Sequence, residues 1–183
     1  MIEVEIKINI SNPRNIKKKI DKIAKFEKNE KKVDDYYTLE PKGTYPKKSL
    51  RIRKKGKIYI VNFKKRGSYQ EGIWAKKETE FVTSNIQGFI DLIKEFGFRK
   101  WVTKKKECKI YRINKDFQIE LNNVKKLGWF LEIEYLTKNN TKGILNAKKN
   151  IKKILEKLDI KNSEIIKDGY TKMLWDLKNK KGK

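Results

Sequence analysis

The sequence predicts an α+β protein whose eight antiparallel strands close into a barrel, a tunnel with a charged interior and helices packed outside. Strand-like segments follow one another in groups instead of alternating with helices, which favours antiparallel pairing. At least six of them carry paired polar side chains on one face and apolar side chains on the other. Three helical segments with apolar stripes need an apolar surface to cover, so the charged faces are expected to point inward. On periodicity alone, the alternative is a half-exposed sheet with surface ion pairs.

The first half of the chain contains the patterns of one strand, one helix and three further strands. Residues Ile2–Ile10 alternate strictly between β-branched apolar and polar side chains, which is typical of a strand. Asn12-Pro13 opens a helix expected to run to about Lys28, with the proline in its first turn. Lys55-Gly56-Lys57 joins two strands as a hairpin. The strands expected after the helix are 33–39, 49–54 and 58–65.

The second half begins with residues 67–72, which we interpret as a polar loop before a strand over 73–82. Ser84 is the expected N-cap of a helix through Phe96, which Gly97 closes. A second helix is expected from Thr141 and a short final one near residues 168–170. The intervening strands are expected at 98–103, 104–114, 117–124 and 128–136. With no repeat and no linker, residues 1–175 are expected to form a single domain, followed by a lysine-rich tail over 176–183.

Composition excludes several kinds of chemistry. The chain has 183 residues, no histidine and one cysteine, Cys108. Without histidine, Ser-His and Cys-His nucleophiles and His-ligated metals are excluded, and a lone cysteine forms neither an internal disulfide nor a zinc cluster. A metal would have oxygen ligands, which favours Mg²⁺, Mn²⁺ or Ca²⁺. No apolar run is long enough to span a bilayer, so we expect a cytoplasmic protein with no membrane partner.

The chain is strongly basic, with 48 Lys plus Arg against 23 Asp plus Glu, a net charge of +25. Net charge alone does not separate a solvated lysine coat from attraction to polyanions. The strand faces are more informative, because they carry both signs. Arg and Lys contact phosphate oxygens, and paired Glu residues supply hard oxygen ligands to Mg²⁺. This mixture indicates a polyphosphate bound together with a metal ion.

Several motifs carry a resemblance to a known family. Glu3-Val4-Glu5-Ile6-Lys7 matches the ExExK signature of the CYTH superfamily, the triphosphate tunnel metalloenzymes. Further landmarks follow in the family's order through to Gly169-Tyr170: Asp34-Asp35-Tyr36-Tyr37, Leu50-Arg51-Ile52-Arg53, Phe63-Lys64, Glu78-Thr79-Glu80, Lys104-Lys105-Lys106, Leu121-Asn122-Asn123-Val124 and residues 127–134. The chain looks most like the class IV adenylate cyclase (CyaB-type) branch. Thiamine-triphosphatase and inorganic-triphosphatase relatives share the fold.

The resemblance implies a closed eight-stranded tunnel that uses Mg²⁺ or Mn²⁺. It implies metal ligands at Glu3, Glu5, Glu132 and Glu134, with Glu78, Glu80 and Asn122 assisting. It implies triphosphate contacts at Lys7, Arg51, Arg53, Lys64, Lys104 and Lys106, and a catalytic set of Lys7, Glu5 and Glu134. Two positions depart from the family's pattern: Asn122 stands where Asp is usual, and Lys106 stands where Arg is frequent.

Three functions are compatible with these residues. The first is cyclisation of ATP to cyclic AMP and pyrophosphate. The second is hydrolysis of inorganic triphosphate, thiamine triphosphate or a nucleoside triphosphate. The third is binding of a polyanion or RNA without turnover. Nucleic-acid binding favours basic residues interleaved with exposed aromatics, and strand aromatics such as Trp74 are more often core, so we expect a nucleotide or polyphosphate partner instead. A homodimer stays open.

Overall fold

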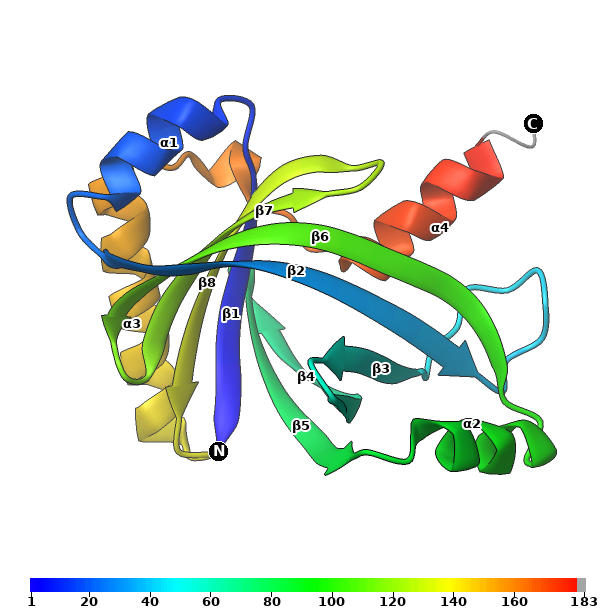
Figure 1. Ribbon diagram of the computed structural model, residues 1–183. Coiled ribbons are helices and arrows are strands. Elements are labelled where there is room, and N and C mark those ends of the chain that lie inside the picture. Colours follow the sequence, from blue (N-terminus) through cyan, green and yellow to red (C-terminus); the bar gives the residue numbers. More distant parts are fainter. Residues whose placement is uncertain (181–183) are drawn as a thin grey trace. The chain divides into compact units, whose positions relative to one another are not determined.

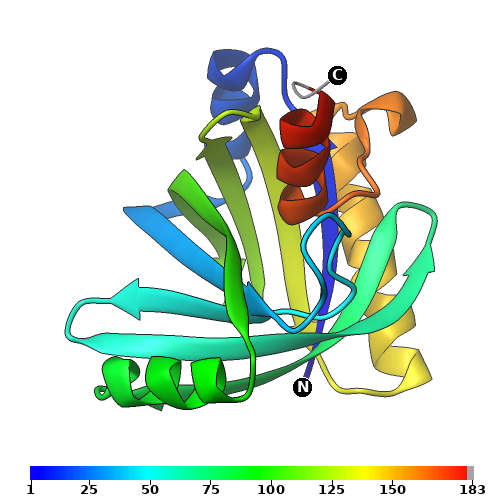
Figure 2. The ribbon, with the colours of Figure 1, turned by 90° about the vertical axis from the view of Figure 1, so that its right-hand side faces the viewer.

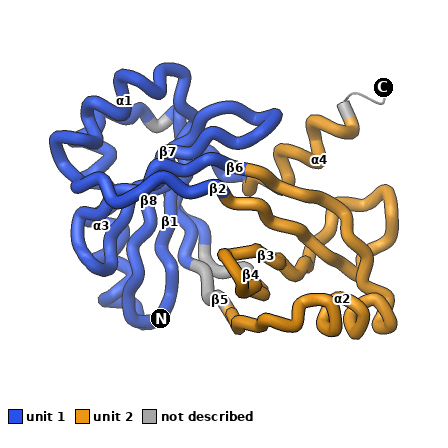
Figure 3. Tube along the Cα trace, viewed as in Figure 1, with its two compact units in different colours: residues 1–31, 65–77, 106–168 blue, residues 32–64, 78–105, 169–183 orange. Residues whose placement is uncertain are grey.

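The computed structural model describes residues 1–180, apart from the side chains of residues 64–68, 76–78, 162 and 180. The chain divides into two compact units (Figure 3). Unit 1 holds residues 1–31, 65–77 and 106–168. Unit 2 holds residues 32–64, 78–105 and the C-terminal segment from residue 169.

The elements are those labelled in Figure 1. In chain order they are β1 (Ile2–Asn9), α1 (Pro13–Ile20), β2 (Lys25–Thr38), β3 (Leu50–Lys55), β4 (Ile58–Gln70), β5 (Ile73–Thr83), α2 (Ile86–Glu95), β6 (Arg99–Asn114), β7 (Phe117–Val124), β8 (Gly128–Thr137), α3 (Thr141–Leu158), a short 3₁₀ turn (Asn162–Glu164) and α4 (Tyr170–Lys180).

Unit 1 is an antiparallel sheet covered by two helices. Its hydrogen-bonded strand order is β5-β1-β8-β7-β6. The helices α1 and α3 lie beside this sheet (Figure 1) and bury their apolar stripes against it. Ile16 and Ile20 of α1 and Ile151 of α3 share one core with Val4 and Ile133. The hydrophobic effect that holds this unit together therefore acts on one face of the sheet only.

Unit 2 has its own smaller core. Antiparallel pairing gives the order β2-β3-β4. Tyr37, Ile52 and Val61 form the buried face of these strands, and Ile93 of α2 packs against them. Figure 2 shows α2 lying along this group of strands. Arg51 and Arg53 alternate with Ile52, so they lie on the face that α2 does not cover.

These observations confirm the α+β class, the antiparallel pairing and, within each unit, the separation of an apolar helix-covered face from a polar face. Closure of the strands into one eight-stranded tunnel stays a prediction. Among the described residues, no helix has both the length and the apolar character to cross a membrane.

The first predicted helix was too long. It was expected to reach Lys28, but α1 ends at Ile20 and the chain enters the strand β2 at Lys25. The amides of Ile23 and Ala24 donate to the carbonyl of Ile20, which closes a turn. Ile23 and Ala24 continue the helical spacing and pack against the core from this turn. Beyond them, residues 25–32 contain Phe26 as their one apolar residue, so no apolar stripe extends the helix to Lys28.

The expected polar loop over residues 67–72 was also wrong, because β4 continues to Gln70 and β5 begins at Ile73. Only Glu71 and Gly72 connect them, with φ of 52° and 82°. Positive φ at both central residues is the geometry of the favoured two-residue hairpin turn. Likewise, the two strands expected over 98–114 form the single strand β6.

The other helices begin and end near their expected bounds. Asn85, and not Ser84, caps α2 by accepting a hydrogen bond from the amide of Gly88. Asn140 caps α3, which begins at Thr141 as predicted. The final helix α4 extends to residue 180, so the first part of the expected lysine-rich tail is helical.

Candidate active site

The polar face of unit 1 gathers carboxylates from three neighbouring strands. In the antiparallel register Glu5 lies opposite Glu134, and Glu132 lies between Lys7 and Glu120. Residues directly opposite one another point to the same side of a sheet. Two sets of three carboxylates have oxygen atoms within 4.8 Å of one another, namely Glu3, Glu5 and Glu134, and Glu120, Glu132 and Glu134.

Glu134 belongs to both sets. Burial, together with the negative charges of Glu120, Glu132 and Glu5, raises the pKa of its carboxyl to about 7. Gln118 donates a hydrogen bond to its Oε2 from Nε2. In the absence of a cation this carboxyl is therefore about half protonated at pH 7, because burial and its neighbours make the charged form costly.

Glu132 lies in a network of donors. The Nζ of Lys106 is 2.9 Å from its Oε2 and 2.8 Å from the Oε2 of Glu120. The Nδ2 of Asn122 donates to the same Glu132 oxygen at 2.8 Å, and the Nζ of Lys7 is 3.4 Å from the other one. Burial alone would raise the pKa of Glu132, but Lys106 and Lys7 outweigh it and lower the pKa. The buried Oδ1 of Asn122 has no hydrogen-bond partner among the described residues.

The polar face of unit 2 is built around Asp34, whose side chain is fully buried. Arg53 donates two hydrogen bonds to its carboxylate, and the Nζ of Lys104 is 2.9 Å from its Oδ2. The rings of Tyr36 and Tyr170 flank that ammonium group, with centroids 5.7 and 5.4 Å away. One acid thus fixes two cations in defined positions.

Arg51 adds a third cation to this face. Its nearest described acid is Glu80, whose Oε2 lies 3.8 Å from Nη2, and Asn62 donates to the same Glu80 oxygen at 3.3 Å. The Nε of Arg51 is buried and has no hydrogen-bond partner among the described residues. A buried donor without an acceptor is costly, and an anion would remove that cost.

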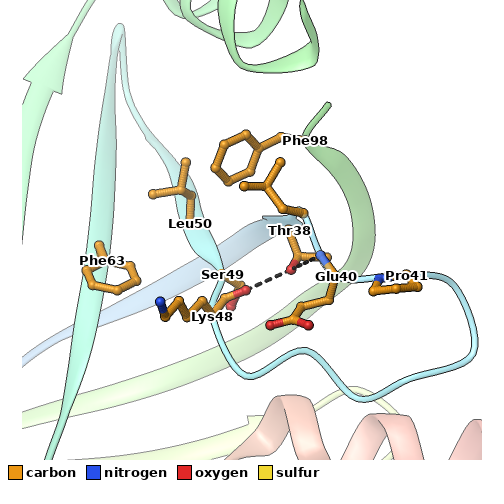
Figure 4. A pocket seen from close by; sticks show the side chains of 9 residues that line it. Thr38, Glu40, Pro41, Lys48, Ser49, Leu50, Phe63 and Phe98 are labelled. Atoms are coloured by element: carbon orange, nitrogen blue, oxygen red, sulfur yellow. Dashed lines mark hydrogen bonds between the residues drawn. The ribbon is translucent and has the colours of Figure 1, made fainter. Parts of the chain in front are cut away.

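A cavity of about 400 Å³ lies in the same unit but on another face (Figure 4). Leu50 and Phe63 line it and lie opposite one another in the β3–β4 register. Arg51 follows Leu50 and points to the other side of the sheet. The cavity rim is fixed by Thr38, which donates to the carbonyl of Lys48 at 2.7 Å. This cavity is therefore separate from the cation cluster.

Comparison with known proteins identifies the family of the chain. The model of the CYTH domain family matches residues 1–170. The chain belongs to the CYTH family. It is 27% identical over 177 residues to a Methanocaldococcus jannaschii protein named "putative adenylate cyclase", covering 94% of this chain and 98% of that one.

Solved structures of other proteins resemble the fold. The PH1012 protein of Pyrococcus horikoshii is 31% identical, with a TM-score of 0.77, covering 93% of this chain and 98% of that one. A Hippeastrum protein described as a "putative adenylyl cyclase" that "reveals a dominant triphophatase activity" has a TM-score of 0.60 at 17% identity, covering 86% and 88% of the two chains. At that identity the second likeness concerns the fold alone.

The residues expected from the CYTH resemblance fall into two groups. Unit 1 brings together Glu3, Glu5, Lys7, Lys106, Asn122, Glu132 and Glu134. Unit 2 brings together Arg51, Arg53, Glu80 and Lys104. Glu80 was expected to assist the metal ligands, but its carboxylate contacts Arg51 and belongs to neither of the two carboxylate sets found among the described residues. Lys64 and Glu78 lie outside the residues whose side chains are described.

The sequence analysis assigned no role in the site to three residues of these faces: Glu120, Asp34 and Lys32. Glu120 completes the second carboxylate set, and Asp34 is the common partner of Arg53 and Lys104. Lys32 is buried on β2, two residues before Asp34 and so on the same face. The signal was available in part, since Glu120 and Asn122 are spaced by two in a strand.

The chemistry of the unit 1 donors fits a divalent metal. Three carboxylates within 4.8 Å of one another offer the hard oxygen ligands that Mg²⁺ and Mn²⁺ prefer. The raised pKa of Glu134 has the same origin, since crowded negative charge is relieved either by a proton or by a cation. The residues present therefore suit the ion that the family resemblance implies.

Proposed function

We propose that this CYTH-family chain is a metal-dependent enzyme that binds a triphosphate and acts as a class IV adenylate cyclase, converting ATP to cyclic AMP and pyrophosphate. The observation that carries the proposal is the pairing of two opposite kinds of polar face in one chain. Unit 1 presents clustered carboxylates, and unit 2 presents clustered cations. The relative named "putative adenylate cyclase", which matches over nearly its whole length, supports the cyclase reaction.

The triphosphate would be held by the cations of unit 2. Arg51, Arg53 and Lys104 supply three positive charges, against the buried Asp34 and the partly exposed Glu80. Asp34 fixes Arg53 and Lys104 before the substrate arrives, so little side-chain entropy is lost on binding. The buried Nε of Arg51 gains an acceptor when a phosphate oxygen lies beside it. Lys64 is proposed as a further phosphate contact from β4.

The metal would be held by Glu3, Glu5 and Glu134, with Mg²⁺ or Mn²⁺ as the ion. When bound, the ion neutralises phosphate charge and stabilises the charge that develops during phosphoryl or nucleotidyl transfer. Lys7 follows Glu5 on the same face of β1. From there its ammonium group would orient the attacking oxygen, which in cyclisation is the 3′-hydroxyl of the ribose.

The proposal includes the fold expected from the sequence. The strands of both units would close into one eight-stranded tunnel, so that carboxylates and cations line the same water-filled bore. Closure would satisfy the hydrogen-bonding groups at the sheet edges. It would also bring a metal ion to the phosphates that the arginines hold.

Hydrolysis of the triphosphate is the second candidate. It is favoured by Asn122, whose neutral amide gives a weaker metal site than a carboxylate would. The Hippeastrum protein of similar fold is described with a dominant triphosphatase activity. In this reaction water replaces the ribose hydroxyl as the nucleophile, and inorganic triphosphate or thiamine triphosphate would serve as well as ATP.

The test is incubation of the purified chain with ATP, inorganic triphosphate and thiamine triphosphate, each with Mg²⁺ or Mn²⁺, followed by chromatographic separation of the products. Cyclic AMP supports the cyclase, and diphosphate plus phosphate supports hydrolysis. Glu5→Gln should abolish either reaction, whereas Glu156→Gln on the exposed side of α3 should not. Binding of triphosphates without any turnover would overturn the proposal and favour a polyanion-binding protein.

A further inference from the structure

Two cation positions are defined by the carboxylates of unit 1. One set consists of Glu3, Glu5 and Glu134, and the other of Glu120, Glu132 and Glu134. Because Glu134 belongs to both sets, the two positions are neighbours on the same face. With carboxylates alone, this arrangement would suit a pair of divalent ions. The chain's own side chains occupy the second of these positions, however.

The second position is already filled by an ammonium group. The Nζ of Lys106 lies between Glu120 and Glu132, at 2.8 and 2.9 Å from one oxygen of each. Its side chain is only 5% exposed. These are lengths typical of charge-assisted hydrogen bonds. An ion entering here would have to displace this buried, covalently tethered cation.

The oxygens of Glu132 are occupied from other directions too. Oε2 accepts from Lys106 and also from the Nδ2 of Asn122 at 2.8 Å. Oε1 lies 3.4 Å from the Nζ of Lys7. A carboxylate whose two oxygens both face donors has little capacity left for a metal. Asn122 therefore acts on this face as a donor through its amide group.

Asn122 and Lys106 act in the same direction on the local charge. An acid at position 122 would add a fourth carboxylate beside Glu132 and strengthen the demand for a mobile cation. The neutral amide removes that demand, and Lys106 supplies a permanent positive charge. With Lys7 beside Glu132 as the second positive charge, Lys106 balances Glu120 and Glu132 without an ion.

We propose that Lys106 is a built-in cation that takes the place of a second metal ion, so that the chain binds a single divalent ion at Glu3, Glu5 and Glu134. The inference rests on the proposed metal-dependent function. It reassigns Lys106 from the triphosphate to the carboxylate face, where it is a positioning residue. The chain then works with one exchangeable ion and one fixed charge.

The number of ions bound is the direct test. Metal-free protein is titrated with Mn²⁺ alone, and free Mn²⁺ is followed by electron paramagnetic resonance alongside calorimetry. Wild type should bind one ion per chain. Lys106→Met should bind two, and the second ion should give a spin-coupled signal. Lys105→Met removes the same charge from an exposed neighbour and should leave one ion.

Lys106→Met could fail to fold, because Glu120 and Glu132 lose the ammonium group that balances them. A double variant keeps the test valid in that case. Lys106→Met with Glu120→Gln removes both charges of the pair and leaves too few ligands at the second position, so it should fold and bind one ion. Three results would overturn the role of Lys106 and leave the metal site intact. They are two ions in wild type, one ion in a folded Lys106→Met protein, and two ions in the double variant. No Mn²⁺ bound by wild type would overturn the metal site itself. One ion without turnover would overturn only the proposed activity.

Discussion

Arg53 holds the buried carboxylate of Asp34 with two hydrogen bonds, from Nε to Oδ1 at 2.5 Å and from Nη2 to Oδ2 at 2.8 Å. The two residues lie opposite one another on β2 and β3, so the strand register itself brings them together. Lys104 adds a third contact to the same carboxylate. The cation cluster of unit 2 is therefore organised by an acid, and its geometry depends on that acid being charged.

Asp34→Asn should destabilise the fold strongly. The substitution keeps the size of the side chain but leaves Arg53 and Lys104 without their common counter-charge. Removing one partner of a buried ion pair costs about 3–5 kcal/mol. Urea unfolding at pH 7 measures the loss. The control is Asp35→Asn on the opposite face, whose partly exposed pair with Lys100 is worth about 0–1 kcal/mol. Equal losses in the two variants would contradict the role of Asp34.

The same pair predicts how stability depends on pH. Burial would raise the pKa of Asp34, but Lys104 and Arg53 outweigh it and hold the pKa below its ordinary value. Because the pKa of Asp34 is lower in the folded state than in the unfolded state, its charge stabilises the fold at pH values above the unfolded pKa of about 4. This stabilisation is lost as the pH falls toward the folded pKa. The stability difference between wild type and Asp34→Asn should therefore stay constant from pH 5 to 8 and shrink only in acid. A stability difference that changes near neutral pH would contradict the lowered pKa of Asp34.

Arg51→Ala should weaken triphosphate binding more than it weakens the fold. Its only described ion pair is the long contact with the partly exposed Glu80, whereas its buried Nε lacks an acceptor. Hydrogen bonds to charged groups contribute about 1.5–3 kcal/mol, so we expect affinity for inorganic triphosphate to fall roughly 10- to 150-fold. Calorimetry measures this, with Arg14→Ala, an exposed arginine in α1, as the matched charge control. Identical losses in both variants would mean that only net charge matters.

Glu134 should make the metal-free protein less stable at high pH. Burial and the neighbouring acids raise the pKa of its carboxyl from 4.5 to about 7, so folding favours the protonated form. The stability that this protonation contributes is fully present below about pH 4.5 and is lost as the pH rises through about 7. With a chelator present, Glu134→Gln should therefore unfold at higher urea than wild type at pH 8, by about 1–3 kcal/mol. The two proteins should converge at pH 5, and parallel pH profiles would contradict the assignment.

Much of the fold could be predicted because alternation reports directly on which face is buried. Ile2–Ile10 and the stripe of α3 were assigned correctly for that reason. The helix expected to reach Lys28 failed because helix length depends on the surface available to cover, which the local pattern does not contain. The hairpin at Glu71-Gly72 was missed because a non-glycine residue takes a positive φ there, which the sequence does not indicate.

The site could be predicted as a set of residues but not as a set of pairs. Spacing by two showed that Glu132 and Glu134 share a face, as do Arg51 and Arg53. Pairing depends on register, which places Asp34 opposite Arg53 and Glu120 opposite Glu132. Asp34 and Asp35 are adjacent acids of the same type, and only the register shows that the first is buried among cations while the second lies on the other face.

Gly72→Ala tests whether the β4–β5 turn is fixed against the segment after α3. Gly72 has a φ of 82°, and a Cβ atom there would lie 2.5 Å from Cγ2 of Ile165. Ile165 pairs with Ile8, and the next amide, of Ile166, donates to the carbonyl of Lys7, so a shift of this segment would reach the polar face of β1. Backbone strain of about 1–3 kcal/mol is expected from the positive φ alone, and overpacking adds about 1–3 kcal/mol more. Gly43→Ala and Gly56→Ala also have positive φ but nothing within 4 Å of the new Cβ, so they should show the strain without the overpacking. Urea unfolding of the three variants separates the two effects, and a Gly72→Ala loss no larger than that of the controls would mean that Ile165 moves aside freely.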